Sequence, residues 1–405
     1  MTPQPLSPLN SPEIIVEPPA DVLAICLSGG GYRAMLFHTG ALWRMLELGF
    51  LGNAGVQVTK PDGTQATVPG IDKISSVSGG TIVSALLALE WAHIAPTTPN
   101  ALDSYKDLVV SRIRDFAGVA LAGTSLEGAA KVIKDILLPG SVSDHIESAY
   151  ASHLYGDKTL QDLPDHPYFV FNASNLQSGA LWRFEKSFMR DYKVGQVKHP
   201  TLALAKAVAA SSAFPPILAP CILDLAPGLV EDNDPAHPDA LSSASYRTKV
   251  FLADGGVYDN LGLETAFKNS RSLLVSNGGA PFDPQDSVHT NWVSIGKRCL
   301  DLMDHQVFAL RTRVLIDNFK QGARLGAFWG ISTDPAKFTC KDPILCSPKR
   351  TRELAAVATD LDAKSPELQE RLINWGYAAA DMSIRSYLHT TAAPPINLPY
   401  PAAGI

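Results

Sequence analysis

The chain has 405 residues, of which 46% are hydrophobic and 18% charged, and its formal net charge is −6. A chain of this size can bury a large core without disulfide or metal staples, and its acidic balance excludes broad electrostatic binding to nucleic acid polymers. Its five cysteines form no CxxC pair or zinc-binding spacing, so we expect free thiols, a reducing compartment, and neither a metal nor another cofactor.

The first twenty residues are rich in Pro, Ser and Glu. They predict a flexible arm at 1–20 and lack the basic start and apolar stretch of a secretory signal. The sequence also contains no run of about 18 apolar residues, so we expect no membrane-spanning helix. These features predict a cytoplasmic protein.

Beyond the arm, predicted strands alternate with predicted helices. An apolar, β-prone segment at 22–27 is followed by a glycine-rich turn and by helical periodicity up to about Gly49. Residues 52–70 predict a loop or a small hairpin, 71–77 a second buried strand, and 81–91 a helix. This alternation indicates an α/β sheet that is covered on both faces.

The middle and the end of the chain are mainly helical in pattern. Residues 93–165 predict helices at 105–116 and 129–138, the second of them amphipathic, and we interpret this region as an insertion or a lid. Further predicted elements are strands at 168–173, 181–184, 250–253 and 272–276, an exposed loop at 224–246, and helices at 202–210, 307–319, 353–361 and 368–388. We therefore expect a domain over 21–290 and a helical region, 291–405, packed on it.

A serine stands between the second predicted strand and its helix, in the sequence Ser-Val-Ser-Gly-Gly at 76–80. A tight strand-to-helix turn with small neighbours is the geometry of a nucleophile elbow. The start of the helix also favours negative charge. The GxSxG pattern has a leading glycine where this chain has Ser76, so the elbow must accept a small side chain there. We predict that Ser78 is a nucleophile.

Two other segments supply what such a serine needs, namely a base and fixed dipoles. Asp254 ends the predicted strand at 250–253 and begins an Asp-Gly-Gly sequence, which makes it the candidate base. Gly29, Gly30 and Gly31 lie between a strand and a helix, so their backbone N–H groups are candidate oxyanion donors. An aspartate of ordinary pKa is a weak base, so we expect partial desolvation of Asp254.

These segments, in this order, resemble those of bacterial members of the patatin-like phospholipase family. The resemblance rests on Ser-Gly-Gly-Gly-Tyr-Arg at 28–33, Ser-Val-Ser-Gly-Gly at 76–80, Asp-Gly-Gly-Val-Tyr-Asp-Asn at 254–260 and Ala-Ala-Ser-Ser-Ala-Phe-Pro-Pro at 209–216. It covers about residues 22–280. It implies a three-layer α/β/α fold with a central, mainly parallel sheet and additional C-terminal helices.

The resemblance also implies a mechanism. Ser78 would attack an ester carbonyl, Asp254 would receive its proton and later activate water, and the glycine loop would hold the oxyanion in a serine hydrolase without a metal. Arg33 would orient the glycine loop or attract a lipid phosphate. Asp259 would support the site by hydrogen bonding or stabilise a turn.

The implied substrate is a phospholipid or another acyl-ester lipid, and the implied partner is a membrane surface contacted transiently, at the inner face. Exposed apolar groups of 93–165 are the expected contact, because the acidic balance predicts little attraction to anionic lipid. Neither the head group, the acyl position, an activator nor the oligomeric state is specified by the sequence.

Three other functions are compatible with parts of the sequence. An α/β-hydrolase with a Ser-Asp-His triad would use His289, His305 or His389. A dinucleotide site would use the glycine loop, but Glu47, the acidic residue that follows it, falls inside a predicted helix. A lipid-binding protein on a decayed hydrolase fold would need no catalytic residue.

Overall fold

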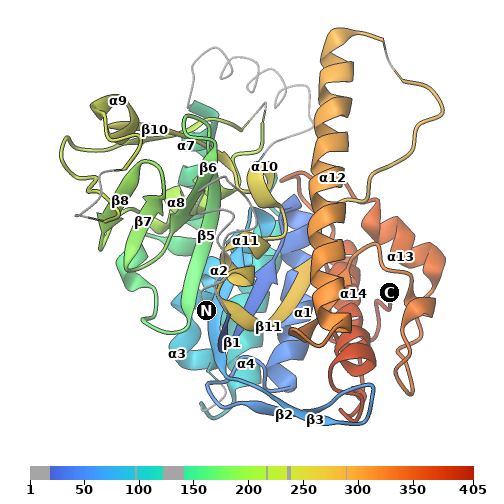
Figure 1. Ribbon diagram of the computed structural model, residues 1–405. Coiled ribbons are helices and arrows are strands. Elements are labelled where there is room, and N and C mark those ends of the chain that lie inside the picture. The colour runs from blue at the N-terminus through green and yellow to red at the C-terminus, as the bar shows by residue number, and fades with distance from the viewer. Residues whose placement is uncertain (1–18, 96–97, 122–140, 216–217, 235–238, 289) are drawn as a thin grey trace.

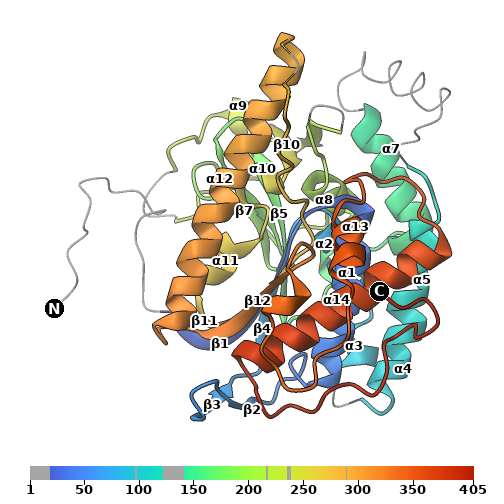
Figure 2. The same cartoon turned by 90° about the vertical axis from the view of Figure 1, so that its right-hand side faces the viewer.

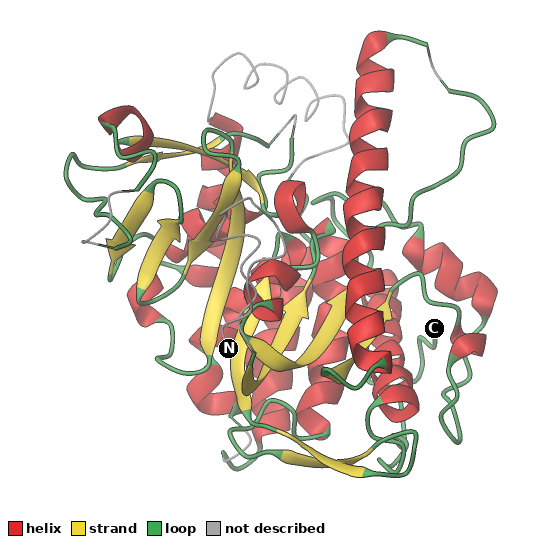
Figure 3. Cartoon of the chain, viewed as in Figure 1, coloured by secondary structure: helices red, strands yellow, loops and turns green. Residues whose placement is uncertain are grey.

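The computed structural model describes residues 19–405 apart from 96–97, 122–140, 216–217, 235–238 and 289 (Figure 1). Most of the expected arm and the whole helix expected at 129–138 lie outside the described residues. Within them, a central sheet lies between helices (Figure 3). This confirms the expected α/β fold.

The sheet has ten strands among the described residues, in the order β12-β11-β1-β4-β5-β6-β7-β8, with β10 pairing β5 and β9. Its strands are β1 (Ala20–Leu27), β4 (Ile71–Ser76), β5 (Tyr168–Asn175), β6 (Ala180–Phe184), β7 (Phe188–Asp191), β8 (Gly195–Lys198), β9 (Cys221–Asp224), β10 (Lys249–Asp254), β11 (Ser270–Asn277) and β12 (Leu325–Gly330). From β12 to β5 all pairings are parallel, and from β5 to β8 all are antiparallel. A separate hairpin, β2 (Val56–Thr59) and β3 (Gln65–Val68), occupies the expected position at 52–70.

Helices cover both faces of the sheet (Figure 2). The α-helices of the described residues are α1 (Gly31–Glu47), α2 (Gly79–Leu89), α3 (Trp91–Ile94), α4 (Ala101–Tyr105), α5 (Ser111–Ala117), α7 (Ser141–Tyr150), α8 (Leu204–Ser211), α9 (Ala244–Arg247), α10 (Gly256–Asp259), α11 (Leu263–Phe267), α12 (Trp292–Lys320), α13 (Pro348–Ala355) and α14 (Pro366–Tyr387). A π-helical segment, Lys106–Val110, joins α4 to α5, and a second, Ala151–Tyr155, follows α7. None of the described helices has the length and apolar content needed to cross a lipid bilayer.

Alternation along β1 divides the core into two layers. Leu23, Ile25 and Leu27 face the large cluster that α1 and α14 complete, whereas Ala24 and Cys26 face a smaller cluster closed by α11 and α12. Successive side chains of a strand point to opposite faces of its sheet, so an apolar run such as β1 belongs to a sheet buried on both sides.

The C-terminal region contributes more than helices. β12 adds a parallel strand to the edge of the sheet beside β11, which the sequence pattern did not predict. α12 is also longer than expected and begins at Trp292 rather than near Val307. The region 291–405 is therefore part of the sheet as well as a cover for it.

Helices α1 and α14 cross with their backbones in contact. A Cβ added at Gly40 would lie 1.8 Å from the carbonyl oxygen of Ile373, and one at Gly376 would lie 1.8 Å from that of Phe37. Backbone atoms cannot rotate away as a flexible side chain can. Both positions therefore require glycine for this crossing.

The ends of β4 and β10 meet along one edge of β5. β4 runs parallel to β5, with Ser76 opposite Phe171, and β10 runs antiparallel, with Asp254 opposite Ala173. Because β6 pairs with 171–175 along the other edge, β4 and β10 share one edge and approach each other end to end. The residues at the two strand ends are thereby brought together.

Candidate functional site

Ser78 lies in the turn between β4 and α2, with φ 50° and ψ −120°. A residue with a side chain rarely adopts a positive φ, and such strain concentrates at functional sites. A Cβ at Gly79 would lie 2.2 Å from the oxygen of Gly31, and one at Gly80 would lie 2.5 Å from that of Leu27. The turn therefore fits beneath the glycine loop only because two glycines follow Ser78.

A hydrogen-bond network holds this turn in place. The Oγ atom of Ser211 accepts from the N–H of Ser78 at 3.1 Å and donates to the carbonyl oxygen of Asn172 at 2.7 Å. Thr81 Oγ1 lies 2.9 Å from Ser211 Oγ and donates to Ser76 Oγ at 3.2 Å. Ser76 is thus accommodated in place of glycine. No role was expected from the sequence for Ser211 or Asn172. The sequence pointed to Ser211 only because it lies in 209–216, one of the segments that carry the family resemblance.

Asp254 is next to Ser78 and is buried, with 2% of its surface exposed. Burial raises its pKa to about 7, and the negative charge of Asp304 adds to this effect. The hydrogen bond from the Gly256 N–H, at 2.7 Å, and the nearby side chain of Ser78 both lower this pKa. The structure therefore brings the two residues together, and the carboxylate is desolvated as expected.

The glycine loop borders Ser78. A Cβ at Gly29 would lie 3.2 Å from Ser78 Cβ and 2.4 Å from Asn260 Oδ1. The Gly29 N–H donates to the carbonyl oxygen of Asn260 at 3.0 Å, so this donor is occupied. Gly30 and Gly31 have φ values of 142° and 60°.

Three N–H groups near Ser78 remain available. In the described part of the chain, the N–H groups of Gly30, Gly31 and Gly79 bind no acceptor. Gly79 was not among the expected donors, although the residue after a nucleophile often contributes to the oxyanion hole. These three groups are the candidate oxyanion donors of this structure.

Arg33 holds the glycine loop against two other segments. It is 1% exposed, and burial lowers its pKa to about 10. Its Nε donates to the carbonyl oxygen of Gly278 at 3.0 Å, and its Nη1 donates to that of Val357. Its Nη2 has no partner among the described atoms and lies 3.1 Å from the position of a Cβ on Gly30. This geometry fits a residue that orients the glycine loop and whose Nη2 donor remains unused.

His38 is a fully buried residue that supports the same loop. Its Nε2 lies 2.9 Å from the carbonyl oxygen of Ser28, and its Nδ1 lies 2.8 Å from Ser276 Oγ. Because a carbonyl only accepts, Nε2 carries the hydrogen and Nδ1 accepts from the serine. Burial lowers the pKa of His38 to about 4, so the ring is neutral and joins the ends of β1 and β11.

Asp259 stabilises the turn before α11, where its carboxylate contacts Leu261, Glu264 and Arg311. Its carboxylate accepts from the N–H of Glu264 at 2.6 Å and from that of Leu261 at 3.3 Å. It thereby caps the start of α11.

The residues of the alternative functions lie elsewhere. Glu47 ends α1 and pairs with Arg44, so it does not follow a second strand as a ribose-binding residue would. His389 accepts from the N–H of Thr59, and His305 stacks on Phe282. His289 is outside the described residues. Within the described part, no histidine is among the groups that shift the pKa of Asp254.

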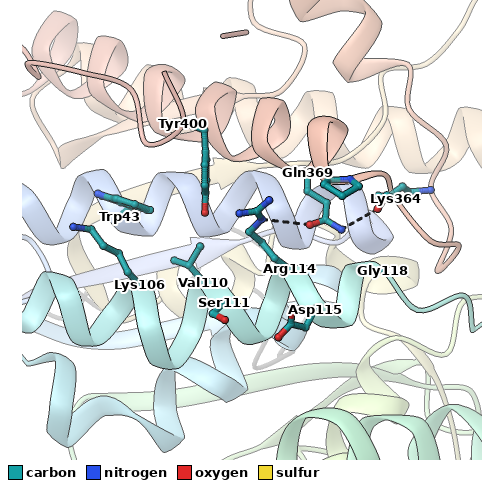
Figure 4. A pocket seen from close by; sticks show the side chains of 11 residues that line it. Trp43, Lys106, Val110, Ser111, Arg114, Asp115, Gly118, Lys364, Gln369 and Tyr400 are labelled. Atoms are coloured by element: carbon teal, nitrogen blue, oxygen red, sulfur yellow. Dashed lines mark hydrogen bonds between the residues drawn. The ribbon is translucent and has the colours of Figure 1, made fainter. Parts of the chain in front are cut away.

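A separate cavity of about 720 Å³ lies between α1, α5 and α14 (Figure 4). Arg114 stacks on the ring of Tyr400, 4.6 Å from its centroid, and Lys106 lies 5.5 Å from that of Trp43. Its cations already have carboxylate partners: Lys106 pairs with Asp103, Arg114 with Glu370, and Lys364 with Asp360. Neither Ser78 nor Asp254 lines this cavity, and we assign it no ligand.

Comparisons with solved structures concern the fold of this chain. The structure of human GIVD cytosolic phospholipase A2 is similar over 88% of this chain and 58% of that chain, with 12% identity and a TM-score of 0.50. Its complex with methyl gamma-linolenyl fluorophosphonate and terbium chloride matches over 90% and 57%, with 13% identity and a TM-score of 0.47. This chain therefore spans less than two thirds of that enzyme, and at such identity the likeness concerns the fold alone. No curated protein sequence matches significantly.

The family comparison is more specific. Residues 25–267, more than half of the chain, match the family model described as patatin-like phospholipase. The matched range contains the glycine loop, Ser78 and Asp254. The chain therefore belongs to the patatin-like phospholipase family.

Proposed function

We propose that the protein hydrolyses acyl esters of phospholipids or related lipids, with Ser78 as the nucleophile and Asp254 as the base. The observation that carries this proposal is the position of the Ser78 side chain, on a strained turn, close enough to the buried carboxylate of Asp254 to lower its pKa. Membership of a phospholipase family supports a lipid substrate.

The reaction begins when Ser78 Oγ attacks the ester carbonyl carbon and its proton passes to the Asp254 carboxylate. The carbonyl oxygen becomes an oxyanion, which the free N–H groups of Gly30, Gly31 and Gly79 stabilise. When the tetrahedral intermediate collapses, the ester bond breaks and the leaving alcohol takes the proton from Asp254. The acyl group remains bound to Ser78 Oγ.

Deacylation repeats these steps with water. The Asp254 carboxylate takes a proton from the water molecule as its oxygen attacks the acyl carbon, and the same N–H groups stabilise the second oxyanion. Collapse releases the fatty acid, and Ser78 regains its proton from Asp254. A carboxylate with a pKa of about 7 accepts a proton more readily than an ordinary aspartate, which suits this double role.

The test is product analysis with a mixed lipid extract. We expect wild type to release fatty acids and lysolipids, detected by mass spectrometry, and expect Ser78→Ala and Asp254→Asn to lower the rate by about 10⁴-fold or more. His305→Ala and His389→Ala are matched controls that should retain turnover. An inert wild type would favour the non-enzymatic lipid-binding alternative, and collapse of activity in a histidine variant would favour the triad.

A further inference from the structure

Helix α12 presents a row of apolar side chains to solvent. Nearly half of the exposed large apolar side chains of the described residues lie on this helix, and their exposed fractions run from 39% to 85%. We call them the apolar face of α12: Trp292, Ile295, Leu300, Leu302, Met303, Val307, Leu310 and Val314. The opposite side is packed, because Leu315 is fully buried and Phe308 and Phe319 contact the small core cluster. A monomeric protein rarely exposes so continuous an apolar surface without a use for it.

The apolar face is fixed relative to the catalytic residues. Arg311 Nη1 lies 2.7 Å from Glu264 Oε2, and its Nε lies 3.6 Å from Asp259 Oδ1, so two ion pairs tie α12 to the segment after Asp254. The first half of α12 projects past α10, the short helix that follows Asp254 in the chain (Figures 1 and 2). The projecting half is therefore beside the proposed active site.

Two more exposed apolar side chains flank Asp254 itself. Phe214 is 53% exposed and follows Ala213, whose carbonyl oxygen accepts from the Asp254 N–H at 2.8 Å. Val257 is 52% exposed and follows Gly256, whose N–H binds Asp254 Oδ1. Apolar surface thus occurs both on α12 and at the catalytic residues.

We propose that the apolar face of α12, together with Phe214 and Val257, docks the protein on a lipid surface; this inference rests on the proposed function. A lipid fits better than a second copy of the chain, because the helix projects beside α10, next to the residues that would act on a lipid ester. Trp292, at the tip, is the residue type that favours the boundary between acyl chains and head groups. Leu300 and Met303 share this face of α12, so a helix lying along the surface brings all three side chains to the lipid.

The charges beside the apolar face are of both signs, with Arg298 and Arg313 against Asp301 and Asp304. Binding therefore depends on apolar burial rather than on attraction to anionic lipid. We expect binding to vesicles of zwitterionic phosphatidylcholine and little change in affinity between low and high salt, because screening acts on charges.

Tryptophan fluorescence of the Ser78→Ala chain, which cannot consume the lipid, reports docking directly. Trp292 is 85% exposed, whereas every other tryptophan is at most 8% exposed. With phosphatidylcholine vesicles, we expect a blue shift and quenching by spin-labelled acyl chains, both lost in Trp292→Phe. An unchanged spectrum, or a shift that survives Trp292→Phe, would contradict docking through this helix.

Vesicle flotation tests the whole surface. We expect Trp292→Ser with Leu300→Ser and Met303→Ser to weaken binding at least about 30-fold, with an unchanged melting temperature. The matched control is Leu345→Ser with Ile396→Ser, which removes two exposed apolar side chains away from α12 and should bind like the parent. Equal binding by the triple variant overturns the proposal.

Analytical sedimentation tests whether a second copy of the chain, rather than lipid, covers the apolar face of α12. Leu300, Met303, Val307, Leu310 and Val314 follow a three-four spacing, which could also pair two helices. A dimer that the triple variant dissociates, without vesicle binding, would assign the face to a second copy and overturn the proposal. If Ser78→Ala binds vesicles while wild type hydrolyses no lipid, the proposed function fails and the docking surface stands.

Discussion

The crossing of α1 with α14 and the loop beside Ser78 both depend on glycine, but glycine has a different structural role in each. At the crossing, Gly40 and Gly376 let two backbones touch, and the neighbouring Arg44 pairs with Asp381 at 2.8 Å. At the loop, Gly30 and Gly31 leave N–H groups without partners, and no cation is among the groups that shift the pKa of Asp254. The crossing brings two backbones into contact, whereas the loop leaves two N–H groups without an acceptor among the described residues, as the proposed oxyanion role requires.

The largest effect that we expect from this difference is a gain in stability on removing the buried charge of Asp254. The folded pKa of Asp254, about 7, lies above its ordinary value of 3.8. The folded state therefore loses stability as pH rises from about 4 to about 7. Asp254→Asn should raise the free energy of unfolding by up to about 4 kcal/mol at pH 8 and by little at pH 4. Urea denaturation at pH 8 and at pH 4 measures both free energies of unfolding. No gain at pH 8 would contradict a buried carboxylate that has no cationic partner.

At the helix crossing we expect the opposite result. Gly376→Ala should destabilise the protein by about 3 kcal/mol, because its Cβ meets a backbone carbonyl. Gly296→Ala is the matched control: this α12 glycine has nothing within 4 Å of an added Cβ, and alanine there should stabilise by up to about 1 kcal/mol. Equal melting temperatures for the two variants would show that the crossing tolerates a side chain.

The pH dependence of activity should follow the carboxylate. Since Asp254 acts as a base only when ionised, kcat/KM for an uncharged soluble ester should rise about tenfold per pH unit up to about pH 7 and then level off. The rate at pH 5 should be about 100-fold below the plateau. If kcat/KM instead reached half of its plateau near pH 4, the Asp254 carboxylate would be solvated rather than buried.

The smallest effect should come from the network behind the turn. Ser211→Ala removes the acceptor of the Ser78 N–H, and we expect kcat to fall about tenfold with little change in KM, since a buried donor loses its partner. Ser383→Ala removes a hydroxyl that donates to Phe328 in the core away from the site, and it should leave kcat unchanged. Equal kinetics for both variants would deny Ser211 a positioning role.

Sequence reasoning located the elements that one-dimensional patterns encode. β1, α1, β4 and α2 follow apolar runs and helical periodicity, and the glycine loop, Ser78 and Asp254 occupy the expected junctions. Because β4 and β10 both end along β5, the structure brings Ser78 and Asp254 together. That meeting could be inferred only from the family resemblance, since no local pattern specifies which strands share an edge.

Other features leave no such local signal. β12 begins Leu-Gly-Ala, and its Gly326 would place a Cβ 1.9 Å from the oxygen of Leu273, so tertiary contact rather than β propensity determines this strand. α12 was expected only at 307–319, but it begins at Trp292, and its first half projects into solvent with several large apolar side chains exposed. The roles of Ser211 and Asn172 depend on three-dimensional contacts alone.

Covalent labelling is the most direct test of the proposed pair. The full chain is treated with a fluorophosphonate, which reacts with activated serines, and the adduct is located by peptide mass spectrometry. We expect a single phosphonyl group on Ser78 in wild type, none in Ser78→Ala, and much slower labelling in Asp254→Asn. An adduct on another serine, or Ser78 labelled equally fast without the Asp254 carboxylate, would contradict a nucleophile activated by that residue.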